Sequence, residues 1–160
     1  MEEEEKLKLK KFVEQLEGYK GRHTQLVTVY IPAGANINNT AKQIAEEQST
    51  AKNIKSTNTR KAVLDSLERI GRHLRLYKQT PKNGLAIFAG NISPLEGQEQ
   101  IEVFWIAPPQ PLRIKLYRCD QTFVLEPLKE MLEVQEVYGL IAIERDHATI
   151  GVLEGKNITV

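Results

Sequence analysis

A short polar segment carries the first set of side chains that could do chemistry, Asn53-Ile54-Lys55-Ser56. The asparagine amide both donates and accepts hydrogen bonds, and the lysine ammonium offers three donors on a flexible stem. These groups suit the edges of unpaired nucleotide bases and the oxygens of phosphates. The plainer alternative makes Asn53 a loop cap and Lys55 a surface lysine, and the four residues alone favour that alternative.

A second set follows at the spacing Tyr-x-Cys-x-x-x-Phe, formed by Tyr117, Cys119 and Phe123. A tyrosine can stack on a base or donate its hydroxyl, whereas a thiol bonds weakly and would shape a pocket rather than read a base. Phe123, and a half-buried Tyr117, are also typical of a protein core. Two further candidates lie upstream. The Glu47 carboxylate accepts hydrogen bonds, as from the amino group of adenine, and the Thr24 hydroxyl can donate or accept.

Signatures of an enzyme are missing. The sequence has no Gly-Lys-Ser/Thr phosphate loop, no Gly-x-Ser-x-Gly and no His-Glu-x-x-His. Its three histidines, His23, His73 and His147, fall in unrelated segments. We therefore predict no catalytic residue, no metal and no cofactor. A hydrolase built on Cys119 stays as the weakest alternative, because a nucleophilic thiol needs a nearby base that the sequence does not show.

The bulk composition is that of an ordinary globular protein. The 160 residues are 41% hydrophobic and 27% charged, with a net charge of +1. The single cysteine excludes an internal disulfide and suits a reducing compartment. No apolar run reaches the ~18 residues that a membrane span needs, and the acidic first residues are unlike a signal peptide. We expect a cytoplasmic protein with no membrane partner.

Positive charge is concentrated in one stretch, from Lys52 to Lys82. Only Asp65 and Glu68 oppose its nine basic residues, which are Lys52, Lys55, Arg60, Lys61, Arg69, Arg72, Arg75, Lys78 and Lys82. Such a stretch can neutralise the phosphates of a nucleic acid, although a solvated helix face is the simpler interpretation. Three of these arginines lie off the apolar stripe of an expected helix and are candidates for contact with an RNA backbone, namely Arg69, Arg72 and Arg75.

Hydrophobic periodicity predicts the elements that position these residues. Apolar side chains at helical spacing indicate helices around 9–16, 40–50 and 63–77, the second one capped by Asn38 or Asn39. Apolar and β-branched runs indicate strands over 26–31, 85–89, 101–106 and 114–117, followed by a short helix over 126–132. Two further strands are expected over 137–143 and 149–153. The polar segment with Lys55 falls between the second and third helices.

Both motifs resemble those of one family, the archaeal and eukaryotic class I peptide chain release factors. Asn53-Ile54-Lys55-Ser56 is similar to the family's decoding motif, and the Tyr-x-Cys-x-x-x-Phe motif follows in the same order. The segments 26–32 and 75–85 resemble the family's flanking sequence, and the similarity extends from the first helix to the last residue. A third family element is a Gly-Thr-Ser loop. This chain has His23-Thr24-Gln25 there, so only the threonine matches.

The resemblance implies an α+β fold in which an antiparallel four-stranded sheet packs against helices. Residues 1–134 would form a stop-codon recognition domain, and residues 135–160 the truncated start of a central α/β domain. In the family, Gly-Gly-Gln in that central domain promotes peptidyl-tRNA hydrolysis, and the motif does not occur here. We therefore expect recognition without hydrolysis. The implied partners are the ribosome, the mRNA stop codon and, through domains absent from this chain, a translational GTPase.

The resemblance also gives the candidate site residues their role. The residues expected to bind the stop codon are Thr24, Glu47, Asn53, Ile54, Lys55, Ser56, Tyr117, Cys119 and Phe123. Ile54 is expected to pack the segment against the domain and so hold its neighbours outward. The main alternative is a general RNA- or ribosome-binding module that uses the basic stretch without reading a codon. Binding that depends on salt but shows no stop-codon preference would indicate that alternative.

Overall fold

Four antiparallel strands form a central sheet in the order β3-β2-β1-β4. The computed structural model describes residues 2–95 and 97–133. The elements follow in the order α1 (Glu3–Glu17), β1 (Leu26–Ile31), α2 (Ile37–Ala51), α3 (Thr57–Leu74), β2 (Leu85–Asn91), β3 (Ile101–Ile106) and β4 (Leu116–Asp120). A short helix over residues 126–133 follows β4. The predicted α+β fold with its antiparallel sheet is confirmed, and the strands expected over 137–143 and 149–153 lie outside the described residues.

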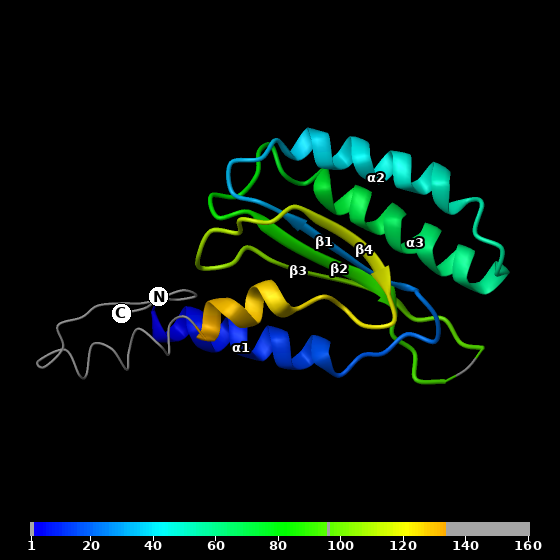
Figure 1. The fold of residues 1–160 in the computed structure, drawn as a ribbon, viewed down its shortest axis with the longest axis horizontal. Coiled ribbons are helices and arrows are strands. Elements are labelled where there is room, and N and C mark those ends of the chain that lie inside the picture. Colours follow the sequence, from blue (N-terminus) through cyan, green and yellow to red (C-terminus); the bar gives the residue numbers. More distant parts are fainter. Residues whose placement is uncertain (1, 96, 134–160) are drawn as a thin grey trace, which may run out of the picture.

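Helices cover both faces of the sheet. Figure 1 shows α2 and α3 on one side, and α1 with the 126–133 helix on the other. Because successive side chains of a strand point to opposite faces, β1 supplies both layers. Its Val27 and Val29 pack under α2 and α3, whereas Leu26 and Tyr30 pack toward α1. This explains why the whole of β1 is buried and why its sequence is apolar apart from Thr28.

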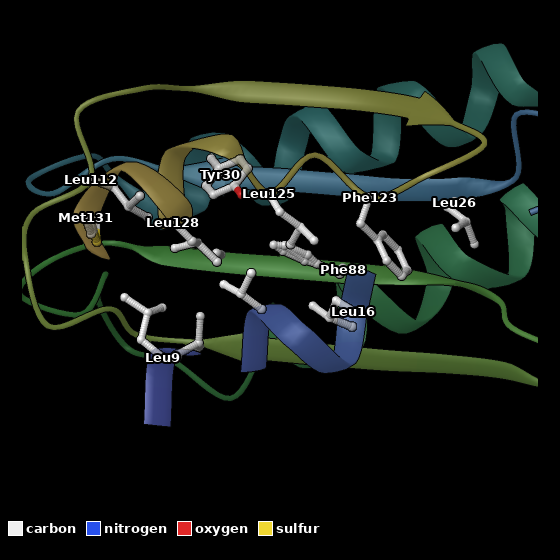
Figure 2. Close-up of a cluster of buried hydrophobic side chains, with 13 residues drawn as sticks. Leu9, Leu16, Leu26, Tyr30, Phe88, Leu112, Phe123, Leu125, Leu128 and Met131 are labelled. Atoms are coloured by element: carbon white, nitrogen blue, oxygen red, sulfur yellow. The ribbon is translucent and has the colours of Figure 1, made fainter. Parts of the chain in front are cut away.

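The layer toward α1 is built around aromatic packing. Phe88 lies in its middle and meets Phe12, Tyr30 and Phe123 edge to face, with ring centroids 5.5–5.8 Å apart. Figure 2 shows the rings of Tyr30, Phe88 and Phe123 in this layer, together with leucines of α1 and Leu128 of the 126–133 helix. The Tyr30 hydroxyl donates a hydrogen bond to the carbonyl oxygen of Val124. The layer therefore ties the chain after β4 to the centre of the sheet.

The layer toward α2 and α3 follows the predicted helical stripe. Val63, Leu67, Ile70 and Leu74 of α3 are buried against the sheet. Asn36 caps α2, its side-chain oxygen accepting from the Asn38 backbone N–H at 2.9 Å. The prediction of Asn38 or Asn39 as the cap was wrong because α2 begins at Ile37, whose side chain is drawn into the core.

The fourth strand also differs from its prediction. The sequence indicated 114–117, and the strand is Leu116–Asp120. Its extent is set by its partner β1, since Leu116 pairs with Tyr30 and Asp120 pairs with Leu26. β1 ends at Ile31, directly before Pro32. The shift brings Cys119 onto the strand, two residues after Tyr117 and on the same face.

Two kinds of feature are absent from the described residues. No described helix has the length and apolar character to cross a membrane. Within the same part of the chain, no three His, Cys, Asp or Glu side chains are grouped so that they could hold a metal ion.

Candidate functional site

The turn between α2 and α3 is held by its own backbone. The Asn53 N–H donates to the Thr50 carbonyl at 3.0 Å, and the Ile54 N–H donates to the Ala51 carbonyl at 3.1 Å. Ile54 is half-buried against the core under α2 and α3, which confirms the anchoring role predicted for it. Asn53 and Lys55, on either side of it, are exposed. One apolar side chain thus fixes the turn and leaves two polar side chains free to bind.

Two further contacts make this turn rigid. Ser56 caps α3, its hydroxyl accepting from the Thr59 N–H at 3.3 Å. The Arg60 guanidinium reaches back and donates to the Ile54 carbonyl at 2.9 Å. Sequence reasoning treated Arg60 only as part of the basic stretch, yet it braces the turn. No local sequence pattern relates Arg60 to Ile54, so the sequence carries no signal that could have identified this contact.

The β4 motif presents a tyrosine and a thiol side by side. The Tyr117 hydroxyl and the Cys119 Sγ are 3.3 Å apart, and both side chains are half-buried. They pack against the same core cluster as Ile54 of the turn. The α2–α3 turn and the Tyr117–Cys119 pair therefore lie on the same side of the sheet.

The Glu47 carboxylate of α2 acts electrostatically on the Tyr117–Cys119 pair. Burial raises the pKa of Tyr117, and the hydrogen bond to Cys119 and the negative charges of Cys119 and Glu47 raise it further. Burial also raises the pKa of Cys119, which the hydrogen bond from Tyr117 lowers and the Glu47 carboxylate raises. Both groups are held in their protonated forms, so the phenol and the thiol can each donate a hydrogen bond.

Thr24 lies on an exposed bend just before β1. The Gly21 N–H donates to the Gln121 carbonyl at 2.7 Å, which joins this connection to the end of β4. A polar hollow borders the bend, and it is lined by Arg22, His23, Gln25, Asn58, Lys61, Asn91, Gly97, Gln98 and Glu99. Figure 1 places the α2–α3 turn, the end of β4 and the connection before β1 at one end of the molecule. Sequence reasoning missed that Lys61 and the β2–β3 connection line this hollow.

The structure does not place Phe123 beside the α2–α3 turn or the Tyr117–Cys119 pair. Phe123 is buried on the opposite face of the sheet, against Phe88 and Phe104. Cys119 and Phe123 of the Tyr-x-Cys-x-x-x-Phe pattern therefore pack in different layers. Cys119 faces the layer of α2, and Phe123 faces the layer of α1.

The three arginines predicted to contact an RNA backbone are placed differently from one another. Arg69 donates to the Ile101 carbonyl of β3 at 3.0 Å. Arg72 forms an exposed ion pair with Glu68 at 2.8 Å. Arg75 is exposed at the C-cap of α3. Their guanidinium groups remain available at the surface, but they do not form one row.

Comparison with known proteins gives one consistent result. Residues 4–133 match the family described as eRF1 domain 1. The peptide chain release factor subunit 1 of Thermococcus kodakarensis is 58% identical over 156 residues, which are 98% of this chain and 38% of the relative. That of Methanocaldococcus jannaschii is 43% identical over 152 residues, 94% of this chain and 36% of the relative. The chain thus spans well under half the length of these relatives.

A solved structure agrees with the sequence relatives. The crystal structure of an archaeal translation termination factor, aRF1, superimposes with a TM-score of 0.72 at 31% identity. The match covers 79% of this chain and 34% of that one.

Proposed function

The chain belongs to the family of eRF1 domain 1, from archaeal-type class I peptide chain release factors, and we propose that it recognises mRNA stop codons in the ribosomal A site. The observation that carries this proposal is the placement of the α2–α3 turn and the Tyr117–Cys119 pair on one side of the sheet. Exposed polar groups of the turn and half-buried groups of β4 can then face a common ligand, as recognition of unpaired bases requires.

Each side chain contributes a distinct kind of contact. The Asn53 amide can pair with a base edge that offers both a donor and an acceptor, and the Lys55 ammonium suits a uridine oxygen or a phosphate. The Glu47 carboxylate accepts from exocyclic amino groups and so favours purines that carry them. Tyr117 supplies a ring for stacking or a hydroxyl donor. Together these groups favour a codon that begins with uridine and continues with purines.

Four other candidates support these contacts. Ile54 and Ser56 hold the turn in shape, and Thr24 extends the polar surface from the connection before β1. Cys119 sets the position of the Tyr117 hydroxyl. We leave Phe123 out of the contact set because it packs in the other layer.

The wider role follows from the family. We propose that residues 1–134 are the recognition domain and that residues 135–160 begin a central domain. Peptidyl-tRNA hydrolysis and the engagement of a translational GTPase would then depend on regions with a Gly-Gly-Gln motif and a C-terminal domain, which these 160 residues do not contain. The ribosome is the partner of this role, and its place of action is the cytoplasm.

Fusion to an intact release factor tests the proposal. The chain replaces the first domain of an archaeal release factor, and peptide release is measured on ribosomes with a stop codon or a sense codon in the A site. We expect release at stop codons only, and a loss of at least about tenfold for Lys55→Ala or Tyr117→Ala, since one lost contact in a closed site costs roughly 1–3 kcal/mol. The matched control is Lys10→Gln on α1, which should release normally. Unchanged release at every stop codon in both variants would exclude this site.

A further inference from the structure

Trp105 is an exposed aromatic side chain on an edge strand. It is the single tryptophan of the chain, and 47% of its surface is exposed. β3 is the last strand on its side of the described sheet. Trp105 pairs with Ile87, so its ring lies on the face covered by α3. About half of the indole surface is therefore open to contact with a ligand.

His73 holds the Trp105 ring in a fixed orientation. The His73 imidazole packs against it, with centroids 4.2 Å apart and an angle of 39° between the planes. His73 is buried, and its Nε2 lies 2.9 Å from the Tyr77 hydroxyl. One side of the indole is therefore supported by a fixed imidazole, while the rest of the ring faces solvent. A pre-oriented aromatic surface of this kind is what base stacking uses.

One side of α3 borders this ring. Arg69, Arg72, His73 and Leu76 follow at i, i+3, i+4 and i+7, so they share one side of the helix and the turn that ends it. Two contacts point that side toward β3, the His73–Trp105 stack and the hydrogen bond from Arg69 to the Ile101 carbonyl. Leu76 is 75% exposed. Trp105 and Leu76 are thus two exposed apolar side chains near the end of α3, where Arg72 directly precedes His73.

The charge around this surface is positive. Every charged side chain from Arg69 to Lys82 is basic, namely Arg69, Arg72, Arg75, Lys78 and Lys82. The acidic groups of α3, Asp65 and Glu68, lie in the middle of the helix, and Glu68 pairs with Arg72 at 2.8 Å. That pair is exposed at both ends, so a phosphate can compete for the guanidinium at little cost. Glu102 of β3 points to the other face, because it lies an odd number of residues from Trp105.

We propose that Trp105, together with Arg72 and Leu76 near the end of α3, is a second nucleotide-binding surface, which takes an unpaired base of a structured RNA. The base stacks on the exposed indole, and its phosphate pairs with the Arg72 guanidinium. This surface does not depend on codon reading. His73 follows Ser56 by about 25 Å along α3, at ~1.5 Å per residue, so the ligand is a different RNA segment from one bound at the α2–α3 turn.

The single tryptophan makes the test direct, because its emission reports on Trp105 alone. The chain is titrated with an oligouridine of about ten nucleotides, a length within the range that single-strand binding surfaces cover. We expect saturable quenching of the indole emission that weakens as salt is raised, because phosphate contacts release counterions. Anisotropy of a labelled oligouridine gives the affinity of variants that lack the indole.

The variants separate stacking from charge. We expect Trp105→Ala to weaken binding by about fivefold or more, Trp105→Phe to retain most of it, and Arg72→Gln to weaken it with a smaller salt dependence. Lys10→Gln, on the opposite layer, is the matched control. The readout is the indole emission and not codon-dependent release, so this test is separate from the test of the codon site.

Two outcomes would overturn the proposal. One is RNA binding that leaves the emission unchanged and is equally tight in Trp105→Ala and Trp105→Phe. The other is an absence of RNA binding combined with self-association that Trp105→Ala abolishes, which would make the surface an apolar contact between two copies of the chain. Arg72→Gln keeps the test decisive if Trp105→Ala proves poorly folded, because it leaves the indole in place.

Discussion

The pKa of Cys119 depends on its burial and on its neighbours Tyr117 and Glu47, so the reactivity of this thiol is a probe of the candidate site. Its pKa is raised first by burial, lowered by the hydrogen bond from Tyr117, and raised again by the nearby Glu47 carboxylate. The thiolate is the reactive form of cysteine, so the alkylation rate measures this balance. A native chain should therefore react more slowly with iodoacetamide than the same chain in denaturant.

Removing the carboxylate gives a sharper prediction. Glu47→Gln should shift the pH dependence of Cys119 alkylation to lower pH, because the neutral amide no longer opposes the thiolate. Glu46→Gln is the matched control, since Glu46 is its exposed neighbour on α2. Identical pH–rate profiles for Glu47→Gln and the parent chain would show that Glu47 does not act on this thiol, and Glu47 would leave the proposed site.

Gly84 shows a backbone requirement at the entry to β2. Its φ is +92°, and a Cβ there would lie 2.3 Å from the Ile31 carbonyl oxygen. Gly84→Ala should lower the free energy of unfolding by about 2 kcal/mol or more, from left-handed strain and the backbone clash together. Gly71→Ala is the control, because a Cβ meets nothing within 4 Å in α3. It should stabilise the chain by about 0.5–1 kcal/mol. Equal effects in urea titrations would contradict this account.

At the scale of an element, the start of α3 joins folding to the proposed function. Ser56 ends the turn that carries Lys55 and caps the helix through Thr59. Ser56→Ala should destabilise the chain by about 1 kcal/mol, and Ser56→Asp should keep the cap. Thermal unfolding of the two variants checks this. If Ser56→Asp is as unstable as Ser56→Ala, the cap is not what the hydroxyl contributes.

The contact between α3 and β3 should make stability depend on pH. Burial lowers the pKa of His73 from its ordinary 6.5. The folded state therefore prefers the neutral imidazole. Its contribution to stability is complete above pH 6.5 and is lost as the pH falls through the lower folded pKa.

Urea titrations across this pH range test the expectation. The parent chain should lose more stability below pH 6.5 than His73→Gln, in which the titrating group is absent. His23→Gln removes an exposed histidine instead and should follow the parent. A parent slope no steeper than that of His73→Gln would show that the buried imidazole does not drive the change.

Local pattern predicted most elements, and tertiary pairing decided the rest. The stripe through Val63 and Leu67 identified α3, and the run 26–31 matched β1, because burial imposes these periods on the sequence itself. The bounds of β4 depended on its pairing with β1, which lies far away in the chain. The Asn36 cap depended on the burial of Ile37, because this burial makes Ile37 the first residue of α2.

The same division holds for the candidate site. The two motifs identified Asn53, Lys55 and Tyr117, and the strand period explains why Tyr117 and Cys119 share a face. The bracing contact of Arg60 and the stack of His73 on Trp105 join residues that no local pattern relates. Phe123 belongs to the same sequence motif as Tyr117, yet the chain leaves the sheet between them and enters the other layer.

At the scale of the whole molecule, the sheet separates two layers. The α1 layer stabilises the fold, and the layer of α2 and α3 carries the proposed RNA contacts. The α1 layer is filled with apolar and aromatic side chains that stabilise the sheet from one side. The proposed contacts with RNA all come from the other side or from its end, where α2, α3 and β4 present their polar groups. A rigid sheet between the two layers keeps the turn and the β4 face in register, which a codon-reading surface requires.

The most direct test of this arrangement is a cross-link from the codon itself. The fusion with an intact release factor is bound to ribosomes whose stop codon carries 4-thiouridine at its first position, and the cross-linked residues are mapped after irradiation. Cross-links to the α2–α3 turn around Lys55, reduced by Lys55→Ala and absent with a sense codon, are the result that we predict. Cross-links that fall instead on the α1 layer, or that are the same for stop and sense codons, would contradict the account.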